Sequence, residues 1–284
     1  MKVLVLGVSG MLGNAMYRVL SGTKEMDVYA TARSHSVKSH FPTRIAEQIR
    51  TGVDVENQDS LERIFSEVKP KVVVNCIGLI KQLSDANDPL LALPINAMLP
   101  HRLARLCDLI GARLVHVSTD CVFAGTRGNY KETDSSDAED LYGKSKYLGE
   151  VNYVHTITLR TSIIGHELAS VHGLIGWFLA QQKSVKGYRR AIFSGLPTVE
   201  LARVIRDIVL PRPELSGLYH VAADPISKYD LLMLVAEIYG KKIEIIPDEE
   251  VVIDRSLNAE RFHSVTGYTA PSWPELVRRM YEFK

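Results

Sequence analysis

Short runs of aliphatic and β-branched residues alternate with helix-like segments over the first 160 residues, and this alternation constrains the fold most strongly. The runs occupy residues 3–6, 28–31, 71–76, 113–118 and 156–160. Each run is apolar along most of its length, whereas a strand with one solvent-facing side would alternate apolar and polar residues. Both faces of these strands must therefore be covered, which predicts an α/β protein with a parallel sheet between two helical layers.

A glycine-rich turn follows the first apolar run directly. Its sequence, GVSGMLG at residues 7–13, stands between that strand and a helix expected over residues 12–20. Glycines permit a tight turn, and the free N–H groups at the start of the helix attract a diphosphate. The pattern therefore predicts a dinucleotide site on a doubly wound sheet of the Rossmann type. The residues expected to contact the cofactor here are Gly7, Ser9, Gly10, Met11 and Leu12.

The residues after the second apolar run bear on the choice between NAD(H) and NADP(H). An acidic side chain there would bind the adenosine ribose 2′-hydroxyl and repel a 2′-phosphate. This chain instead has Arg33 and Ser34, and an arginine can bind a 2′-phosphate through paired N–H donors. NADP(H) is therefore favoured over NAD(H). Asp54, followed by Val55, is a candidate acceptor for the adenine amino group.

Hydroxyl and amine groups follow the fourth apolar run in an order that suits carbonyl reduction. Ser118 and Thr119 end that strand, and Tyr142 and Lys146 come later, four residues apart on one face of a predicted helix. We expect the Lys146 ammonium to lower the pKa of the Tyr142 phenol, which could then pass a proton to a carbonyl oxygen while a hydride reaches the carbon. Thr119, with Ser118 as second choice, would hold the substrate oxygen. Tyr142 and Lys146 would also contact the cofactor.

Six motifs together resemble the extended short-chain dehydrogenases/reductases, and more closely the dTDP-4-dehydrorhamnose reductase group. They are GVSGMLG, NCIG, the segment around Asn96, STDCVFAG, YGKSK and LRTS, all within the first 165 residues. The resemblance implies an NADPH-dependent reductase of a nucleotide-linked 4-keto-6-deoxyhexose, in polysaccharide precursor synthesis. It also implies that Cys76, Ile77 and Gly78 lie beside the cofactor, and that Asn96 lies on the helix behind the active site.

Two positions depart from the pattern of this group where the sugar would bind. Cys121 stands where the group usually has tyrosine, and Ile163 stands where it usually has tryptophan. A pocket without these rings has a different shape and less stacking surface. A UDP-linked 4-keto-6-deoxy-N-acetyl sugar therefore competes with dTDP-4-dehydrorhamnose as the expected substrate. Asp120 and Arg255 complete the substrate-site candidates, since the group tends to carry an arginine near the substrate nucleotide at the position of Arg255.

Two other functions remain open on the same scaffold. A nucleotide-sugar epimerase or 4,6-dehydratase would keep NAD(P) tightly bound, but a dehydratase commonly has an acidic pair where this chain has Asp120 and Cys121. A non-catalytic NADP-binding sensor or scaffold would typically lose the tyrosine or the lysine. Tyr142 and Lys146 are both present, so the reductase is the favoured interpretation.

The change of pattern after residue 160 predicts the domain organisation. Residues 1–160 are expected to form the dinucleotide-binding domain, with a return segment near 196–224, and residues 161–284 mainly a smaller, interwoven substrate-binding lobe. The basic run at 183–190 would either meet the substrate diphosphate or end a helix in solvent. Within the first domain, Asp59 or Ser60 is the expected N-cap of a helix that ends at residue 68.

Charge and composition argue against several classes of partner. The chain has 34 basic and 33 acidic residues, a net charge of +1, which gives no general attraction to nucleic acid or anionic membrane. Its three cysteines and nine histidines match no zinc or disulfide pattern, so no metal is expected. Without a signal-peptide pattern or an apolar run of ~18 residues, a cytoplasmic location is expected. A small-molecule substrate is the expected partner, and a homodimer is left open.

Overall fold

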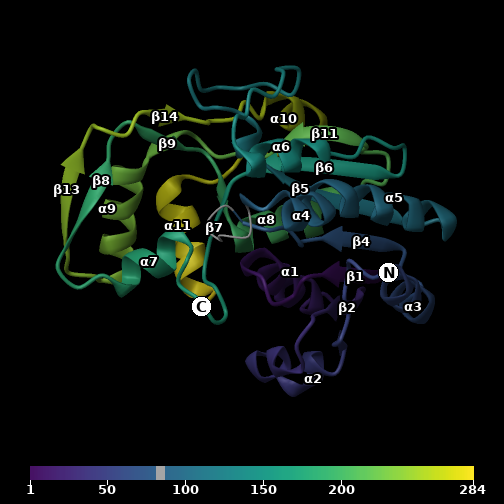
Figure 1. Ribbon diagram of the computed structural model, residues 1–284. Coiled ribbons are helices and arrows are strands. Elements are labelled where there is room, and N and C mark those ends of the chain that lie inside the picture. The colour runs from purple at the N-terminus through teal and green to yellow at the C-terminus, as the bar shows by residue number, and fades with distance from the viewer. Residues whose placement is uncertain (81–86) are drawn as a thin grey trace.

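The centre of the computed structural model is a seven-stranded parallel sheet, and the structure describes residues 1–80 and 87–284. Figure 1 shows this sheet with helices on both sides and a smaller lobe beside it. The strand order β11-β6-β5-β4-β1-β2-β3 is the doubly wound order with one strand added at an edge. The strands are β1 (Lys2–Leu6), β2 (Asp27–Thr31), β3 (Ile49–Arg50), β4 (Val72–Asn75), β5 (Arg113–Thr119), β6 (Thr156–Thr161) and β11 (Gly217–His220).

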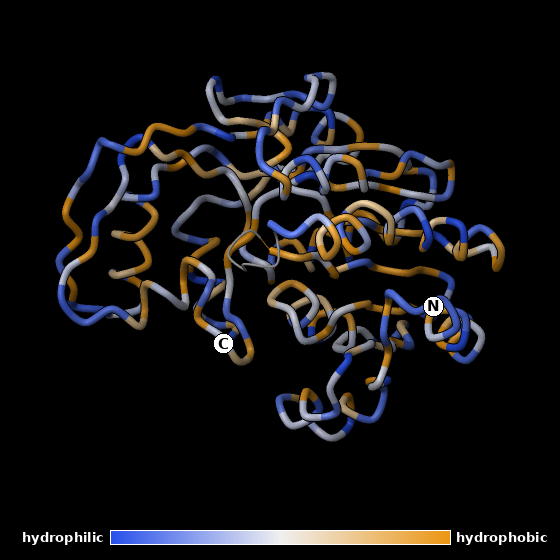
Figure 2. Tube along the Cα trace, in the orientation of Figure 1, coloured by the Kyte–Doolittle hydropathy of each residue, from blue (hydrophilic) through white to orange (hydrophobic). Residues whose placement is uncertain are grey.

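Strand β1 illustrates why the sheet is covered on both faces. Val3 and Val5 belong to one apolar cluster, which α1 and α8 complete, while Leu4 and Leu6 belong to a second cluster with α3 and α5. Successive side chains of a strand point to opposite faces, so a continuous apolar run fills two cores at once. In Figure 2 the hydrophobic colour accordingly follows the central strands, while peripheral loops are hydrophilic.

The helices connect the strands and cover the sheet. Those of the first 160 residues are α1 (Met11–Ser21), α2 (Thr43–Ala46), α3 (Gln58–Val68), α4 (Pro89–Ala92), α5 (Leu99–Leu109) and α6 (Leu141–Leu148). The later ones are α7 (Leu174–Ala180), α8 (Thr198–Val204), α9 (Lys228–Tyr239), α10 (Glu260–Thr266) and α11 (Trp273–Glu282). Short 3₁₀ helices are η1 (His35–His40) and η4 (Asp120–Val122), and π-helical turns are η3 (Leu93–Met98) and η5 (Ile205–Val209).

The second half of the chain is divided between the sheet and a small lobe. In the return segment near 196–224, β11 pairs with β6 and α8 packs on the same face as α1. The lobe carries three small sheets. Its strands are β7 (Ile163–Ile164), β8 (Ser184–Tyr188), β9 (Ala191–Phe193), β10 (Leu196–Pro197), β12 (Ile226–Ser227), β13 (Glu244–Asp248) and β14 (Ile253–Asp254). Figure 1 shows the lobe to the left of the central sheet, with α9 next to strands β8 and β13.

Two local expectations are wrong. The basic run at 183–190 is not a helix end, because its residues Ser184–Tyr188 form strand β8, where Lys186 pairs with Asp248 at 2.7 Å. The N-cap of α3 is Asn57, whose side chain accepts a hydrogen bond from the Ser60 backbone N–H at 3.0 Å, so the helix begins earlier than expected. The partners seen in the structure are the Asp248 carboxylate for Lys186 and the Asn57 side chain for the Ser60 N–H, and the local sequence pattern indicated neither.

Among the described residues no helix is long and apolar enough to cross a membrane. The same residues contain no group of three or more His, Cys, Asp or Glu side chains arranged to hold a metal ion.

Candidate active site

The glycine loop lies where strands β1 and β4 are neighbours, at the point where the strand order reverses. Gly7 has a φ of +88°, and a Cβ atom on it would lie 2.6 Å from the Cγ1 atom of Ile77. A Cβ atom on Gly13 would overlap the carbonyl oxygen of Gly7. Only glycine fits at these two positions. The turn thus brings the start of α1, with its free N–H groups, to the carboxyl edge of the sheet, which fits a dinucleotide diphosphate.

Two asparagines hold the loop after β4, residues 76–79, which we term the cofactor-side loop. The Asn75 carboxamide oxygen accepts from the Ile77 backbone N–H at 3.1 Å, and its nitrogen lies 3.2 Å from Nδ1 of the buried His116. The Asn96 oxygen accepts from the Leu79 N–H at 2.9 Å, and its nitrogen donates to the Leu79 carbonyl at 3.2 Å. These bonds fix the loop opposite Gly7. Asn96 is itself buried, so it supports the loop from behind.

The remaining cofactor candidates lie farther out on the same edge. Arg33 and Ser34 follow β2 after one residue, Ala32, and are exposed. The Arg33 carbonyl accepts from the Gly52 N–H at 3.0 Å, which joins this turn to the next one. Asp54 is also exposed, and one of its oxygens accepts from the Glu56 N–H at 3.0 Å, while Val55 is buried in the core. The exposed side chains of Arg33, Ser34 and Asp54 can therefore contact a ligand only if that ligand extends along this edge of the sheet.

Thr119 and Tyr142 come together at the end of β5. Their side chains are hydrogen-bonded to each other, and the Thr119 hydroxyl donates to Asp120 at 3.1 Å. Gly143 allows this approach, because a Cβ atom there would overlap the Cys121 carbonyl oxygen. Asp140 begins α6 by accepting from the Gly143 N–H at 2.7 Å, so the helix starts with Tyr142 in its first turn.

Lys146 follows Tyr142 by one helical turn and is almost completely buried. Its ammonium donates to the Val117 carbonyl at 2.9 Å, and Gly78 of the cofactor-side loop lies close to it. Burial lowers the pKa of Lys146 to about 8, and the Glu150 carboxylate partly offsets this effect. Lys146 thus faces the space between α6 and the cofactor-side loop.

The pKa of Tyr142 differs from the expectation. Burial raises it well above its ordinary value, and the charges of Cys121 and Asp120 act in the same direction, while the hydrogen bond with Thr119 opposes them. The Lys146 ammonium, which donates to the Val117 carbonyl, does not offset this rise. Tyr142 is therefore held as a neutral phenol, the form that can donate a proton.

Ser118, the second choice for the substrate hydroxyl, points into a different network. Its hydroxyl donates to Glu150 at 2.7 Å, and Arg160 binds the same carboxylate with two nitrogens, at 2.7 and 2.6 Å. Adjacent residues of a strand face opposite sides, so Ser118 and Thr119 cannot both face Tyr142. The structure places only Thr119 beside the phenol.

The four substrate candidates come from three segments. Asp120 is buried, and burial raises the pKa of its carboxyl group, an effect that the nearby Arg255 guanidinium opposes. Arg255 reaches across from the small lobe and donates to the Phe123 carbonyl at 2.7 Å. Cys121 and Ile163 are partly exposed, at the end of β5 and in β7. Arg255 and Asp120 are thus electrostatic neighbours contributed by the two halves of the chain.

The sequence analysis missed four residues that shape this site. Ser145 receives a hydrogen bond from Asn96 at 3.3 Å, and Ser162 is hydrogen-bonded to Asp120. Asn75 and His116 hold the cofactor-side loop from below. A polar residue inside an otherwise apolar strand, as in VVVNC, was the one available signal, since buried polar groups need partners.

This arrangement defines a class of protein. A glycine loop at the strand-order reversal, a hydroxyl at the end of β5 and a Tyr-x-x-x-Lys pair on α6 together constitute the site of the extended short-chain dehydrogenases/reductases. The family model described as the RmlD substrate binding domain matches residues 1–282. The chain belongs to that family, in the dTDP-4-dehydrorhamnose reductase-like group. It is thereby an oxidoreductase of the short-chain dehydrogenase type.

Relatives and solved structures agree over most of the chain. The dTDP-4-dehydrorhamnose reductase of Escherichia coli (strain K12) is 25% identical over 99% of this chain and 97% of its own length. The methionine adenosyltransferase 2 subunit beta of Bos taurus is 26% identical over 91% of this chain and 79% of its own. A hypothetical dTDP-4-dehydrorhamnose reductase from Sulfolobus tokodaii superposes with a TM-score of 0.79 at 25% identity, covering 96% of this chain and 98% of that one.

Proposed function

We propose that this protein is an NADPH-dependent reductase of a nucleotide-linked 4-keto-6-deoxyhexose. The observation that carries the proposal is the Tyr142 phenol, hydrogen-bonded to Thr119, with Lys146 one turn along the same helix and facing the cofactor-side loop. Relatives named dTDP-4-dehydrorhamnose reductase support the substrate class, and one of them, from Salmonella typhimurium, is 26% identical over 80% of this chain and 84% of its own.

Thr119, Tyr142 and Lys146 each have a role that their position supports. The cofactor, when bound, supplies a hydride to the carbonyl carbon. Tyr142 gives its hydroxyl proton to the carbonyl oxygen, so that C=O becomes CH–OH. Thr119 holds that oxygen next to the phenol. Lys146 places a positive charge near the developing phenolate, where a low-dielectric site strengthens the attraction.

The cofactor preference rests on the edge of the sheet after β2. Arg33 and Ser34 are exposed there, where they can receive the 2′-phosphate of NADPH, and the turn holds no carboxylate that would repel it. A solved dTDP-4-dehydrorhamnose reductase from Bacillus anthracis contains NADP, although at 21% identity the likeness concerns the fold. A homodimer and a cytoplasmic location stay predictions.

The side chains at and near the end of β5 indicate which substrate the site accepts. Asp120 and Arg255 offer an acceptor and a fixed cation for hydroxyl groups and for the nucleotide part. Cys121 and Ile163 leave room that aromatic rings would fill, which suits a sugar with a bulkier substituent. Both dTDP-linked and UDP-linked 4-keto-6-deoxy sugars, the latter with an N-acetyl group, are therefore the compounds to compare.

The first experiment follows NADPH oxidation by the purified full chain with dTDP-, UDP- and GDP-linked 4-keto-6-deoxy sugars. One NADPH consumed per sugar reduced, with one nucleotide clearly preferred, is the expected result. NADP(H) binding without any consumption would overturn the reductase and favour the self-contained epimerase, or the NADP-binding sensor. Product analysis by NMR distinguishes these two, because an epimerase still converts the sugar, into a stereoisomer of the same mass.

Substitution of Tyr142 tests the proton donor. Tyr142→Phe keeps the ring and its packing but removes the proton, so we expect turnover to fall by roughly 10²–10⁴ while NADPH binding persists. Tyr147→Phe, an exposed tyrosine of the same helix, is the matched control and should leave turnover unchanged. Turnover near the wild-type value in Tyr142→Phe would remove this residue from the mechanism.

Substitution of Arg33 tests the cofactor preference. Arg33→Gln removes the charge that would bind the 2′-phosphate, so we expect KM for NADPH to rise about 10–100-fold, and KM for NADH, which lacks that phosphate, to stay constant. Arg44→Gln alters an exposed arginine of α2 and serves as control. An equal effect on both cofactors would show that Arg33 does not read the 2′-phosphate.

A further inference from the structure

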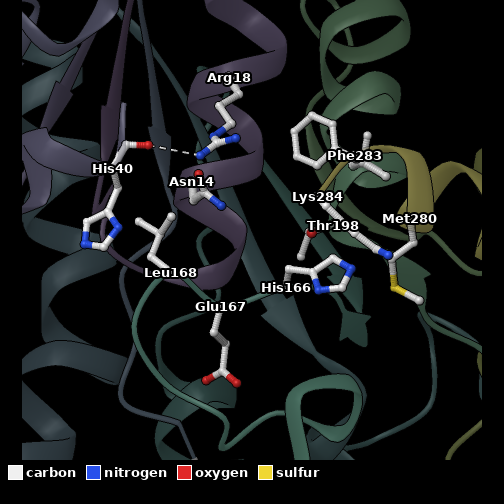
Figure 3. A pocket seen from close by; sticks show the side chains of 11 residues that line it. Asn14, Arg18, His40, His166, Glu167, Leu168, Thr198, Met280, Phe283 and Lys284 are labelled. Carbon is white, nitrogen blue, oxygen red and sulfur yellow. Dashed lines mark hydrogen bonds between the residues drawn. The ribbon is translucent and has the colours of Figure 1, made fainter. Parts of the chain in front are cut away.

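A cavity of about 240 Å³ lies apart from the Tyr142 site, between α1 and the end of α11. Figure 3 shows Asn14 and Arg18 reaching it from α1, with Met280, Phe283 and Lys284 on the opposite side. The end of η1, the loop before α7 and the start of α8 contribute the rest. Its lining residues are Asn14, Arg18, His40, His166, Glu167, Leu168, Thr198, Val199, Met280, Phe283 and Lys284.

Two α1 side chains that line this cavity each have one polar atom without a hydrogen-bond partner. Asn14 is 7% exposed, and its Oδ1 atom has no hydrogen-bond partner among the described residues. The same holds for Nε of Arg18, one helical turn along. Buried polar atoms in proteins are nearly always hydrogen-bonded, because leaving one without a partner is costly. Two such atoms, on side chains that line the same cavity, point to a polar ligand.

The charges around the cavity indicate the sign of that ligand. Arg18 is held in place by its bond to the His40 carbonyl at 3.1 Å. Lys284 approaches from the other side, with its amine 3.6 Å from the centre of the Tyr281 ring. Among the described residues of the lining, Glu167 is the one with a side-chain carboxylate, and it already accepts from the Ser170 hydroxyl and from the Gly173 N–H, both at 2.7 Å. The side chains of the lining therefore include two cations, Arg18 and Lys284, and one carboxylate, Glu167, whose two oxygens are already hydrogen-bonded.

His166 adds no charge to this balance. Its Nε2 atom lies 2.8 Å from the Tyr239 hydroxyl, and burial together with the Lys284 ammonium lowers the pKa of the imidazole. It is neutral at physiological pH, so the cavity stays positive through Arg18 and Lys284.

We propose that this cavity binds a small oxyanion, a phosphate or a carboxylate, between the guanidinium of Arg18 and the ammonium of Lys284. The Asn14 carboxamide, whose oxygen and nitrogen can exchange places by rotation, supplies a donor to it. A volume of about 240 Å³ is below the usual ~300–1,000 Å³ of cofactor and drug-sized sites, so a dinucleotide does not fit. The bound anion would join α1 of the sheet domain to the end of α11.

The test measures the melting temperature of the full chain at constant ionic strength, with chloride replaced stepwise by phosphate or by acetate. We expect a saturable rise for at least one oxyanion, since a ligand that binds only the folded state stabilises it. Arg18→Gln should raise the half-saturating concentration by about tenfold or more, because it removes a charge-assisted hydrogen bond. The control, Arg63→Gln, alters an exposed arginine of α3 and should behave as wild type.

Each outcome bears on the proposal. Phosphate alone, or acetate alone, raising the melting temperature identifies which oxyanion the cavity accepts. A rise that persists unchanged in Arg18→Gln would place the anion elsewhere, such as at the glycine loop, and overturn the proposal. So would equal effects of chloride and both oxyanions. If Arg18→Gln fails to fold, Asn14→Asp replaces it, because a carboxylate at that position repels the anion and should abolish the rise.

Discussion

At the scale of single residues, the site depends on a lysine whose charge is easily lost. Lys146 is almost fully buried, and its amine has a carbonyl partner, Val117, at 2.9 Å. Burial disfavours the charged form, so the pKa of Lys146 lies near 8 instead of its ordinary value above 10. The ammonium is therefore present at neutral pH but disappears within the mildly alkaline range, where the Tyr142 phenol still keeps its proton.

This pKa predicts the alkaline side of the pH profile. We expect kcat/KM to fall as pH rises through about 8, because Lys146 loses the charge that stabilises the Tyr142 phenolate. Above about pH 8 the contribution of Lys146 to the free energy of unfolding changes in the opposite direction to kcat/KM. Between the folded-state pKa and the higher unfolded-state pKa the unfolded chain binds more protons, so stability rises with pH there.

Steady-state rates measured between pH 6 and 10, at pH values about 0.5 apart, test this prediction. Lys146→Arg is the matched variant, because a guanidinium stays charged throughout, so its lower residual activity should show no decline near pH 8. A wild-type profile that is flat through pH 8, or the same decline in both proteins, would contradict the assignment.

At the scale of elements, α3 illustrates how a cap and an apolar stripe define a helix together. Leu61, Ile64, Phe65 and Val68 are buried at the spacing of one helix face. The helix starts where the Asn57 side chain accepts from the Ser60 N–H, at 3.0 Å, and it ends at Lys69, which has a left-handed φ of +48°. The stripe fixes which face is buried, and the cap fixes where the helix begins.

The position of this cap is testable. Asn57→Ala removes an acceptor for a free N–H, so we expect the free energy of unfolding to fall by about 1 kcal/mol. Asp59→Ala, which alters only a charge in the first turn, should cost a few tenths, about 0.3 kcal/mol. Urea unfolding followed by circular dichroism compares the two. A larger loss for Asp59→Ala would mean that Asp59 caps the helix after all.

At the scale of the whole molecule, a buried ion pair ties the last helix to the sheet domain. Glu200 of α8 is 3% exposed and binds Arg279 of α11 at 2.7 Å, and it also accepts from the Tyr268 hydroxyl at 3.1 Å. Arg279 is more exposed and has a second partner, Glu275, at 2.9 Å. Loss of Arg279 would leave the buried Glu200 carboxylate without its cation, whereas loss of the Glu200 charge would leave Arg279 paired with Glu275.

This asymmetry predicts unequal effects of removing the two partners. Arg279→Gln leaves a buried carboxylate without its cation, and we expect a loss of about 3 kcal/mol in the free energy of unfolding. Glu200→Gln keeps an acceptor for Tyr268 and leaves Arg279 paired with Glu275, so about 1 kcal/mol is expected. Equilibrium denaturation of both variants gives the comparison. Equal losses would indicate that the two charges are equally desolvated.

Much of the sheet domain could be predicted because its signals are local. Continuous apolar runs require strands buried on two faces, and Gly7 and Gly13 occupy positions where no other residue fits. The pair Tyr142 and Lys146 could likewise be placed on one helix face from their spacing alone. Which of Thr119 and Ser118 faces Tyr142 was harder to predict, since it depends on which face of β5 meets α6.

The sequence by itself therefore determined the layered fold, the glycine loop and the spacing of the proposed catalytic residues, because these follow from backbone geometry within a few residues. The tertiary structure alone decided the partners of the buried polar groups. Asn75 meets His116 across 41 positions of the chain, and Asn96 meets Ser145 across 49. It also decided the pKa of Tyr142 and Lys146, since desolvation depends on everything packed around a side chain and is not encoded in its neighbours along the chain.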